Sequence, residues 1–338
     1  EETAAARARN RCWPLDDARL RWYAYARVAW WHLLAGLHLQ PGDNILMPDL
    51  ICDVMTEPLR RLGLHARYYT SEPLRAITPA DLRPHFDDRT RAVLAVHYFG
   101  LPKDLRDVAA YCREMGVPLV EDASQAMLSQ DEQRPIGRYG AATLFSFRKT
   151  LKLPHGAGLI CNDVALDHRL AETPAHLAAP RRDVWRYWAK RFDRRWFGGC
   201  CEKLLDSIRA RRSGGSHDRP AGEPSLVDPF DPCLVRPGRS ARWLVLHWDI
   251  CKEIHRRREL FDRLAQRWYD EALPGRPLLT TLPPGWVPYA FALESDEMDA
   301  EQTSRDLQAL GLPAEPWPRL PDDVSVNVAD RRKVLILL

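Results

Sequence analysis

Five polar side chains with complementary chemistry lie within about thirty residues in the middle of the sequence. Asp122 and Gln125 follow one apolar run, and Ser146 stands inside another. Two lysines, Lys149 and Lys152, come shortly after that serine. A carboxylate can hold a proton or a cation, and a lysine amine can form a Schiff base with a carbonyl compound. The grouping therefore predicts a site for lysine chemistry next to a carboxylate.

The segments that carry these residues alternate between strands and helices. The patterns predict helices over 27–39, 54–62 and 104–115, and strands over 44–47, 65–69, 92–96, 117–120, 141–147 and 158–161. Strands that are apolar throughout, rather than at every second residue, are typical of a parallel sheet covered by helices on both faces. Ligands bind such sheets beyond the carboxyl ends of the strands, which is where the polar residues fall.

The length of the chain favours two domains, because single cores stop growing at roughly 250–300 residues and this chain has 338. We expect a large domain over 1–238 and a small C-terminal α/β domain over 239–338. The small domain is predicted to contain a long helix over 240–272, a strand over 287–294, a helix over 300–310 and a strand over 333–338.

Two segments at the end of the large domain have unusual compositions. Residues 181–212 are helical in character and basic, and residues 213–239 are rich in Gly, Pro, Ser and Asp, which predicts a long loop. Four aromatic residues within 185–196 share one face of the basic helix. Contact of that face with a membrane is the less favoured interpretation; packing on the large domain or on a second subunit is favoured.

Composition and charge exclude several classes of protein. The net charge is only +3, which argues against a nucleic-acid-binding protein. No stretch approaches the roughly 18 apolar residues of a membrane-spanning helix, and residues 1–11 are polar, so we expect a cytoplasmic protein. The eight cysteines form no CxxC pair and have no histidine at zinc-ligand spacing, so no metal site is predicted.

Four short motifs follow one another along the chain: PGDNILMP at 41–48, VHYFG at 96–100, VEDASQA at 120–126 and LFSF at 144–147. Together they resemble the DegT-type sugar aminotransferases, a branch of the fold-type-I pyridoxal-phosphate-dependent enzymes. The resemblance runs over 26–163 and more weakly over 239–273. Their shared order and spacing make the four motifs together more specific than any one alone.

The resemblance implies pyridoxal 5'-phosphate as cofactor, with pyridoxamine 5'-phosphate as its aminated form. Asp122 matches the family residue that keeps the ring nitrogen protonated, as the electron sink requires. Gln125 matches the group that binds the phenolic oxygen, and Ser146 the serine that holds the phosphate. Arg27 stands where the family has a Gly-Thr or Gly-Ser turn at a helix N-terminus, a place suited to phosphate. His97 is expected to line the cofactor.

The sequence departs from the family at the lysine that holds the cofactor. In the family this lysine comes five residues after the strand serine, and here that position is Leu151. Lys149 and Lys152 stand on either side of it, and the sequence does not decide between them. If the strand continued past Ser146, its two-residue periodicity would direct Lys149 to the same face as Leu151.

Three interpretations follow. In the first, the chain is an aminotransferase in which Lys149 or Lys152 replaces the displaced lysine, and it acts on a keto-sugar, which can be nucleotide-linked. In the second, it is a lysine-less sugar dehydrase that uses pyridoxamine phosphate and a histidine, for which His155 is the candidate. In the third, it is a non-catalytic binding or scaffold protein. By resemblance, we expect a homodimer.

Overall fold

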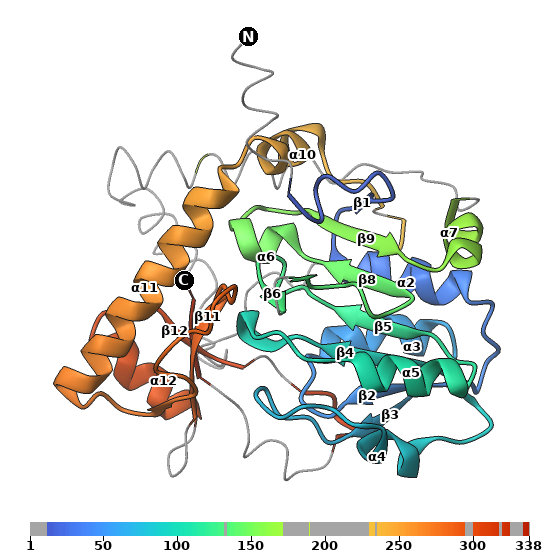
Figure 1. Ribbon diagram of the computed structural model, residues 1–338, viewed down its shortest axis with the longest axis horizontal. Coiled ribbons are helices and arrows are strands. Elements are labelled where there is room, and N and C mark those ends of the chain that lie inside the picture. Colours follow the sequence, from blue (N-terminus) through green and yellow to red (C-terminus); the bar gives the residue numbers. More distant parts are fainter. Residues whose placement is uncertain are drawn as a thin grey trace, which may run out of the picture.

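A seven-stranded sheet forms the largest part of the fold (Figure 1). The computed structural model describes residues 12–131, 134–171, 189, 230–233, 235–294, 300–317, 320–324 and 334–337. Across the sheet the strands run in the order β1 (Arg21–Tyr23), β9 (Ala157–Cys161), β8 (Ala142–Phe145), β5 (Leu119–Asp122), β4 (Thr90–Val96), β2 (Asn44–Pro48) and β3 (His65–Tyr69). All neighbours from β8 to β3 pair in parallel, whereas β9 is antiparallel to β8 and to β1. The predicted α/β class with a mostly parallel sheet is confirmed.

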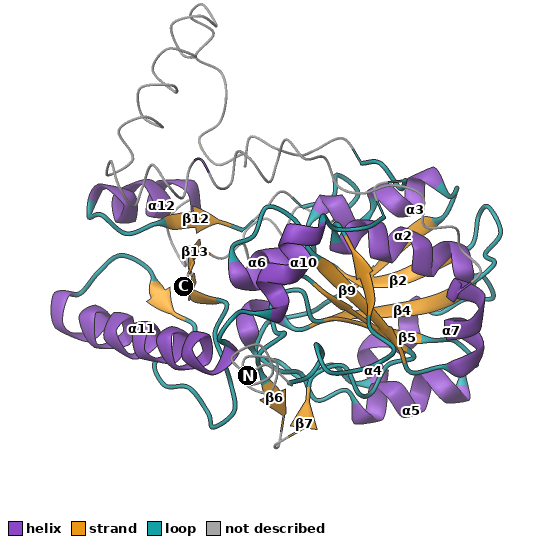
Figure 2. Ribbon diagram, turned by 90° about the horizontal axis from the view of Figure 1, so that it is seen from above, coloured by secondary structure: helices purple, strands orange, loops and turns teal. Residues whose placement is uncertain are grey.

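Helices cover both faces of this sheet (Figure 2). On one face, Leu94 and Val96 of β4 pack in a core cluster with α2 (Ala26–Gly36). On the other, Val93 packs with α5 (Arg106–Glu114), because successive strand residues point to opposite faces. The remaining elements around the sheet are α3 (Glu57–Arg61), α4 (Pro79–Leu82), α6 (Phe147–Leu151), α7 (Val164–Ala171), the 3-10 turns η1 (Asp53–Met55), η2 (Arg83–His85) and η3 (Tyr98–Gly100), and the hairpin of β6 (Gln130–Asp131) and β7 (Arg134–Pro135).

The C-terminal part of the chain builds a second sheet with its own core. Its strands run in the order β10 (Arg276–Pro277), β11 (Ala290–Glu294), β13 (Val334–Leu337) and β12 (Ala314–Pro316). The helices are α10 (Arg239–Leu246), α11 (Ile250–Glu271) and α12 (Ala300–Ala309). Phe261 and Trp268 of α11 pack with Phe291 of β11. None of the helices in these described ranges is both long and apolar enough to cross a membrane.

Two predicted elements are wrong in ways that affect the site. The single helix expected over 240–272 is two helices, because Asp249 begins α11 by accepting a hydrogen bond from the Lys252 amide (3.0 Å). The strand expected over 141–147 ends at Phe145, and α6 begins at Phe147. The two-residue periodicity of a strand therefore does not apply to the lysines.

Several expectations fall on residues that the structure does not describe. They concern the basic segment 181–212, with the exception of Ala189, the aromatic face within 185–196, and residues 213–229 of the predicted loop. The division into domains at residue 238 stays a prediction.

Candidate functional site

Asp122 ends β5, the strand in the middle of the sheet, and is only 8% exposed. Its Oδ1 accepts a hydrogen bond from the Ser124 amide at 2.8 Å. Its Oδ2 makes no hydrogen bond or ion pair to the residues that the structure describes. A buried carboxylate is costly unless it meets donors or a cation. Asp122 thus offers an acceptor for a positively charged N–H group at the carboxyl edge of the sheet.

Gln125 lies in the turn that follows, with its amide held in one orientation. Its Oε1 accepts a 2.9 Å hydrogen bond from the backbone N–H of Phe99. Because a backbone N–H can only donate, the atom that faces it is the amide oxygen. The NH2 group of Gln125 is therefore free of this contact and remains a donor.

Ser146 and the start of α2 form a second polar region. Ser146 is the N-cap residue of α6 and is buried. Tyr25 is the N-cap residue of α2, provides no side-chain cap, and has no acidic residue in the turn that follows. The guanidinium groups of Arg27 and Arg148 lie 5.5 and 5.8 Å from the Tyr25 ring centre. Two cations beside an uncapped helix N-terminus suit a phosphate group.

Arg148 is the member of this region that the sequence analysis missed. It follows Ser146 by two residues, but its contact with Tyr25 joins positions 123 apart in the chain. A basic residue next to the strand serine was the only signal in the sequence.

The helical form of α6 separates the positions that compete for the lysine role. Leu151 is 1% exposed and packs in a core cluster with Phe145 and Phe147. Lys149 lies about 200° away around the helix axis, since each residue turns the helix by about 100°. Position 151 therefore faces the core, and Lys149 faces away from it.

The positive charge of Lys149 acts electrostatically on Cys52, which lies in the loop that follows β2. Burial raises the pKa of the Cys52 thiol, and the positive charge of Lys149 acts in the opposite direction. In the sheet, β5 and β4 lie between β8, which leads into α6, and β2, which precedes Cys52. Asp122 ends β5.

Lys152 takes another direction. It is the C-cap residue of α6, with a left-handed φ of 50°, and it is exposed. Partial burial of its amine lowers the pKa of Lys152, and the charges of Arg257 and Arg256 on α11 lower it further. Lys152 is therefore near α11.

His97 takes part in a buried hydrogen-bond network. Its Nδ1 accepts a hydrogen bond from the Lys103 amide (3.0 Å), so its Nε2 carries the proton and donates to Glu121 at 3.1 Å. Glu121 also accepts hydrogen bonds from three backbone amides, those of Gly137, Tyr139 and Gly140. The described hydrogen bonds of His97 are thus with the protein, and its place beside the cofactor stays a prediction. Strand alternation directs Glu121, the partner of His97, and Asp122 to opposite faces.

His155 is fully buried, and neither of its ring nitrogens has a hydrogen-bond partner within the described part of the chain. Burial, with a smaller contribution from Arg148, lowers the pKa of His155 to about 4. The ring is therefore neutral at pH 7.

A stability measurement tests this burial. An unfolded histidine has a pKa near 6.5, so between that pH and 4 the unfolded chain binds more protons than the folded one. We expect the free energy of unfolding to fall by about 2 kcal/mol from pH 7 to pH 5 on account of His155 alone. In urea unfolding, His155→Leu should lose this part of the pH dependence, and His65→Leu, an exposed control, should keep it. An equal slope in all three proteins would contradict the assignment.

Known proteins resemble this chain in sequence and in fold. The curated UDP-N-acetyl-3-dehydro-alpha-D-glucosamine 3-aminotransferase of Acidithiobacillus ferrooxidans is 27% identical over 141 residues, which cover 40% of this chain and 38% of the relative. The match thus spans about two fifths of that relative's length. The solved aminotransferase TlmJ from Streptoalloteichus hindustanus superposes with a TM-score of 0.66 at 19% identity, covering 99% of this chain and 83% of the other.

A third relative is a GDP-4-keto-6-deoxymannose-3-dehydratase solved with a trapped pyridoxal phosphate–glutamate species. It gives a TM-score of 0.64 at 15% identity and covers 100% of this chain and 88% of its own. The family model for DegT/DnrJ/EryC1/StrS aminotransferases matches residues 28–198, which is half of the sequence and runs from the first turn of α2 to beyond β9. The chain therefore belongs to the DegT/DnrJ/EryC1/StrS aminotransferase family.

Proposed function

We propose that this chain is a pyridoxal-phosphate-dependent aminotransferase that moves an amino group from an amino-acid donor such as glutamate to a keto-sugar. One observation carries the proposal: Asp122 is buried at the carboxyl end of the central strand with an oxygen that meets no described partner. A pyridine ring withdraws electrons well only while its nitrogen is protonated, and a carboxylate at that nitrogen keeps it so. Asp122 fits this requirement.

The other polar groups fit the rest of the same cofactor. The free NH2 of Gln125 would donate to the phenolic oxygen, and the hydroxyl of Ser146 would donate to the phosphate. Arg27 and Arg148, with the N-terminus of α2, would neutralise the phosphate charge. Bound there, pyridoxal phosphate would supply the electron sink for breaking a C–H bond next to nitrogen.

We propose that Lys149, and not Lys152, is the lysine that forms the Schiff base with the cofactor. The action of its charge on Cys52 supports this, because β5, which Asp122 ends, lies in the sheet between the strands that precede Lys149 and Cys52. The amine would hold the cofactor and afterwards move a proton between carbon atoms of the substrate. Lys152, which lies toward α11, would have no such role.

A nucleotide-linked keto-sugar is the acceptor class that we propose. The name of the Acidithiobacillus relative specifies a UDP-linked dehydro-sugar, which supports this class without identifying the compound. We also propose a homodimer that works in the cytoplasm, on the family resemblance alone. Light scattering of the purified protein would test the dimer.

Titration with pyridoxal phosphate tests the proposal as a whole. We expect the purified chain to turn yellow as the aldehyde reacts with a lysine, and we expect borohydride to fix the cofactor to the protein in a one-to-one ratio. Absorbance and intact-mass spectrometry measure the two effects. A protein that neither changes colour nor gains the reduced mass, and that binds no pyridoxamine phosphate, would be the non-catalytic module.

His155 supports a second candidate function, a lysine-less sugar dehydrase. This ring is neutral at pH 7, and both its nitrogens lack described partners. The charge of Arg148, beside the proposed phosphate region, contributes to its lowered pKa. Tight binding of pyridoxamine phosphate without any borohydride-fixed product would favour this function over the aminotransferase.

A further inference from the structure

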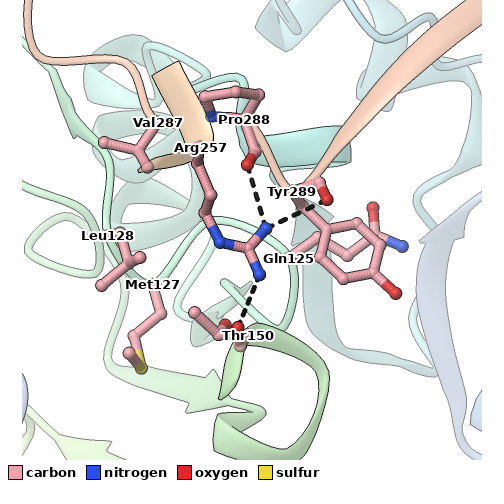
Figure 3. Close-up of a pocket in the computed structure, with 8 residues that line it drawn as sticks. All are labelled: Gln125, Met127, Leu128, Thr150, Arg257, Val287, Pro288 and Tyr289. Atoms are coloured by element: carbon pink, nitrogen blue, oxygen red, sulfur yellow. Dashed lines mark hydrogen bonds between the residues drawn. The ribbon is translucent and has the colours of Figure 1, made fainter. Parts of the chain in front are cut away.

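Arg257 of α11 is a buried arginine that joins three parts of the chain (Figure 3). It is 1% exposed, and its Nε donates to Glu253 at 2.7 Å. One terminal nitrogen donates to the carbonyl oxygens of Pro288 and Tyr289, both at 3.1 Å, and the other donates to the carbonyl of Thr150 at 2.5 Å. A single guanidinium thus ties α11, the segment before β11 and α6 together.

The bond to Thr150 holds the helix that carries Lys149. With five residues, α6 is too short to be stable by itself. Thr150 lies in its last turn, directly after Lys149, where carbonyl groups lack partners within the helix and attract positive charge. The Arg257 guanidinium supplies both the donor and the charge. The direction of Lys149 therefore depends on a contact made from α11.

The contact of Arg257 with Tyr289 is connected to Gln125 by two further hydrogen bonds. The Tyr289 carbonyl accepts from Arg257, the Tyr289 amide donates to the Phe99 carbonyl (2.8 Å), and the Phe99 amide donates to Gln125. In Figure 3, Gln125, Tyr289 and Thr150 all lie around the guanidinium and line one small cavity.

The η3 turn and the 287–289 segment are in such close contact that neither can shift past the other. A Cβ on Gly100 would lie 2.2 Å from the Val287 carbonyl oxygen, so only glycine fits there. Movement of the 287–289 segment is therefore passed directly to the turn that orients Gln125.

We infer that Arg257 is a positioning residue that fixes Lys149 and Gln125 relative to each other. This inference rests on the proposed function for the roles of those two side chains, but not for the contacts. Loss of Arg257 should misdirect the lysine and loosen Gln125, while the groups that bind the ring nitrogen and the phosphate stay in place. Covalent capture of the cofactor should therefore suffer more than its non-covalent binding.

The test compares Arg257→Met and Arg257→Lys with Arg263→Met, a control that removes an exposed arginine of the same helix, paired with Glu259. Without cofactor, hydrogen–deuterium exchange of peptides covering 147–152 and 97–100 should be at least roughly tenfold faster in Arg257→Met. The rate of borohydride-fixed capture of pyridoxal phosphate should fall at least roughly tenfold, while the dissociation constant of pyridoxamine phosphate changes by less than about threefold. Arg257→Lys, which keeps the charge near Glu253, should be intermediate, and the control should match the parent protein.

The outcomes separate the two hypotheses. Unchanged exchange at 147–152 in a folded Arg257→Met protein would overturn the positioning role. Capture and pyridoxamine binding that fall together would also overturn it. If the parent protein captures no cofactor, the proposed function fails, and the exchange measurement still decides the role of Arg257. If Arg257→Met does not fold, Arg257→Lys and the double variant Glu253→Gln/Arg257→Met, which leaves no buried charge unpaired, answer the same question.

Discussion

Asp122→Asn is expected to slow the reaction of the cofactor-loaded protein with glutamate by roughly 10²–10⁴-fold, the range typical of a lost proton-holding group. Asparagine has the same shape, and its carbonyl oxygen can still accept the hydrogen bond from the Ser124 amide. Its NH2 group, however, would donate to the ring nitrogen and leave that nitrogen unprotonated. The fold stays intact while the electron sink is lost. Stopped-flow absorbance of the donor half-reaction measures the effect without knowledge of the acceptor.

Asp163→Asn is the matched control for this experiment. Asp163 also follows a strand and accepts a hydrogen bond from a backbone amide, that of Leu166 at 2.8 Å, but it is exposed. Its variant should react at the parent rate. A parent-like rate in Asp122→Asn would remove the observation on which the proposed function depends.

Lys149→Ala is expected to abolish borohydride-fixed capture of the cofactor and to reduce donor turnover by at least roughly 10³-fold, because both the covalent link and the proton carrier disappear. Lys152→Ala should retain both within about threefold, since removal of an exposed side chain has small effects. Peptide mapping of the reduced parent protein should place the pyridoxyl group on the peptide that contains Lys149.

The reverse pattern would assign the role to Lys152 and would require α6 to turn in the loaded protein. Retained capture in both single variants would point to a lysine outside this helix, and Lys149→Ala/Lys152→Ala would then still form the reduced product. Added methylamine should partly restore turnover to Lys149→Ala if the missing group is an amine that moves protons.

The strands and the position of Asp122 could be predicted from the sequence because their signals are local. Buried parallel strands are apolar throughout, and the end of β5 is marked by the change from Val120 to two acidic residues. The sequence could not show that Glu121 and Asp122 have different roles. The three amides that saturate Glu121 come from residues 137–140, a turn whose shape leaves no apolar pattern.

The direction of the Lys149 side chain could not be predicted from sequence patterns, for a different reason. Five residues are too few to show helical periodicity, so α6 resembled a continuation of β8. The contact that fixes its end comes from Arg257, which is 107 residues away in the chain. Arg148 was missed on similar grounds, because the ring that it contacts belongs to Tyr25.

The contrast between Glu121 and Asp122 has a consequence for how the chain tolerates change. Four donors from the protein meet Glu121, and Asp122 keeps an oxygen for an incoming molecule, yet only the pleat of β5 distinguishes the two. A one-residue insertion before residue 121 would move Glu121 to the face that Asp122 now occupies. It would bring the wrong carboxylate to the ligand edge and would leave a buried charge without its amides. Length changes in this strand should therefore be rarer among functional variants than substitutions of its apolar residues.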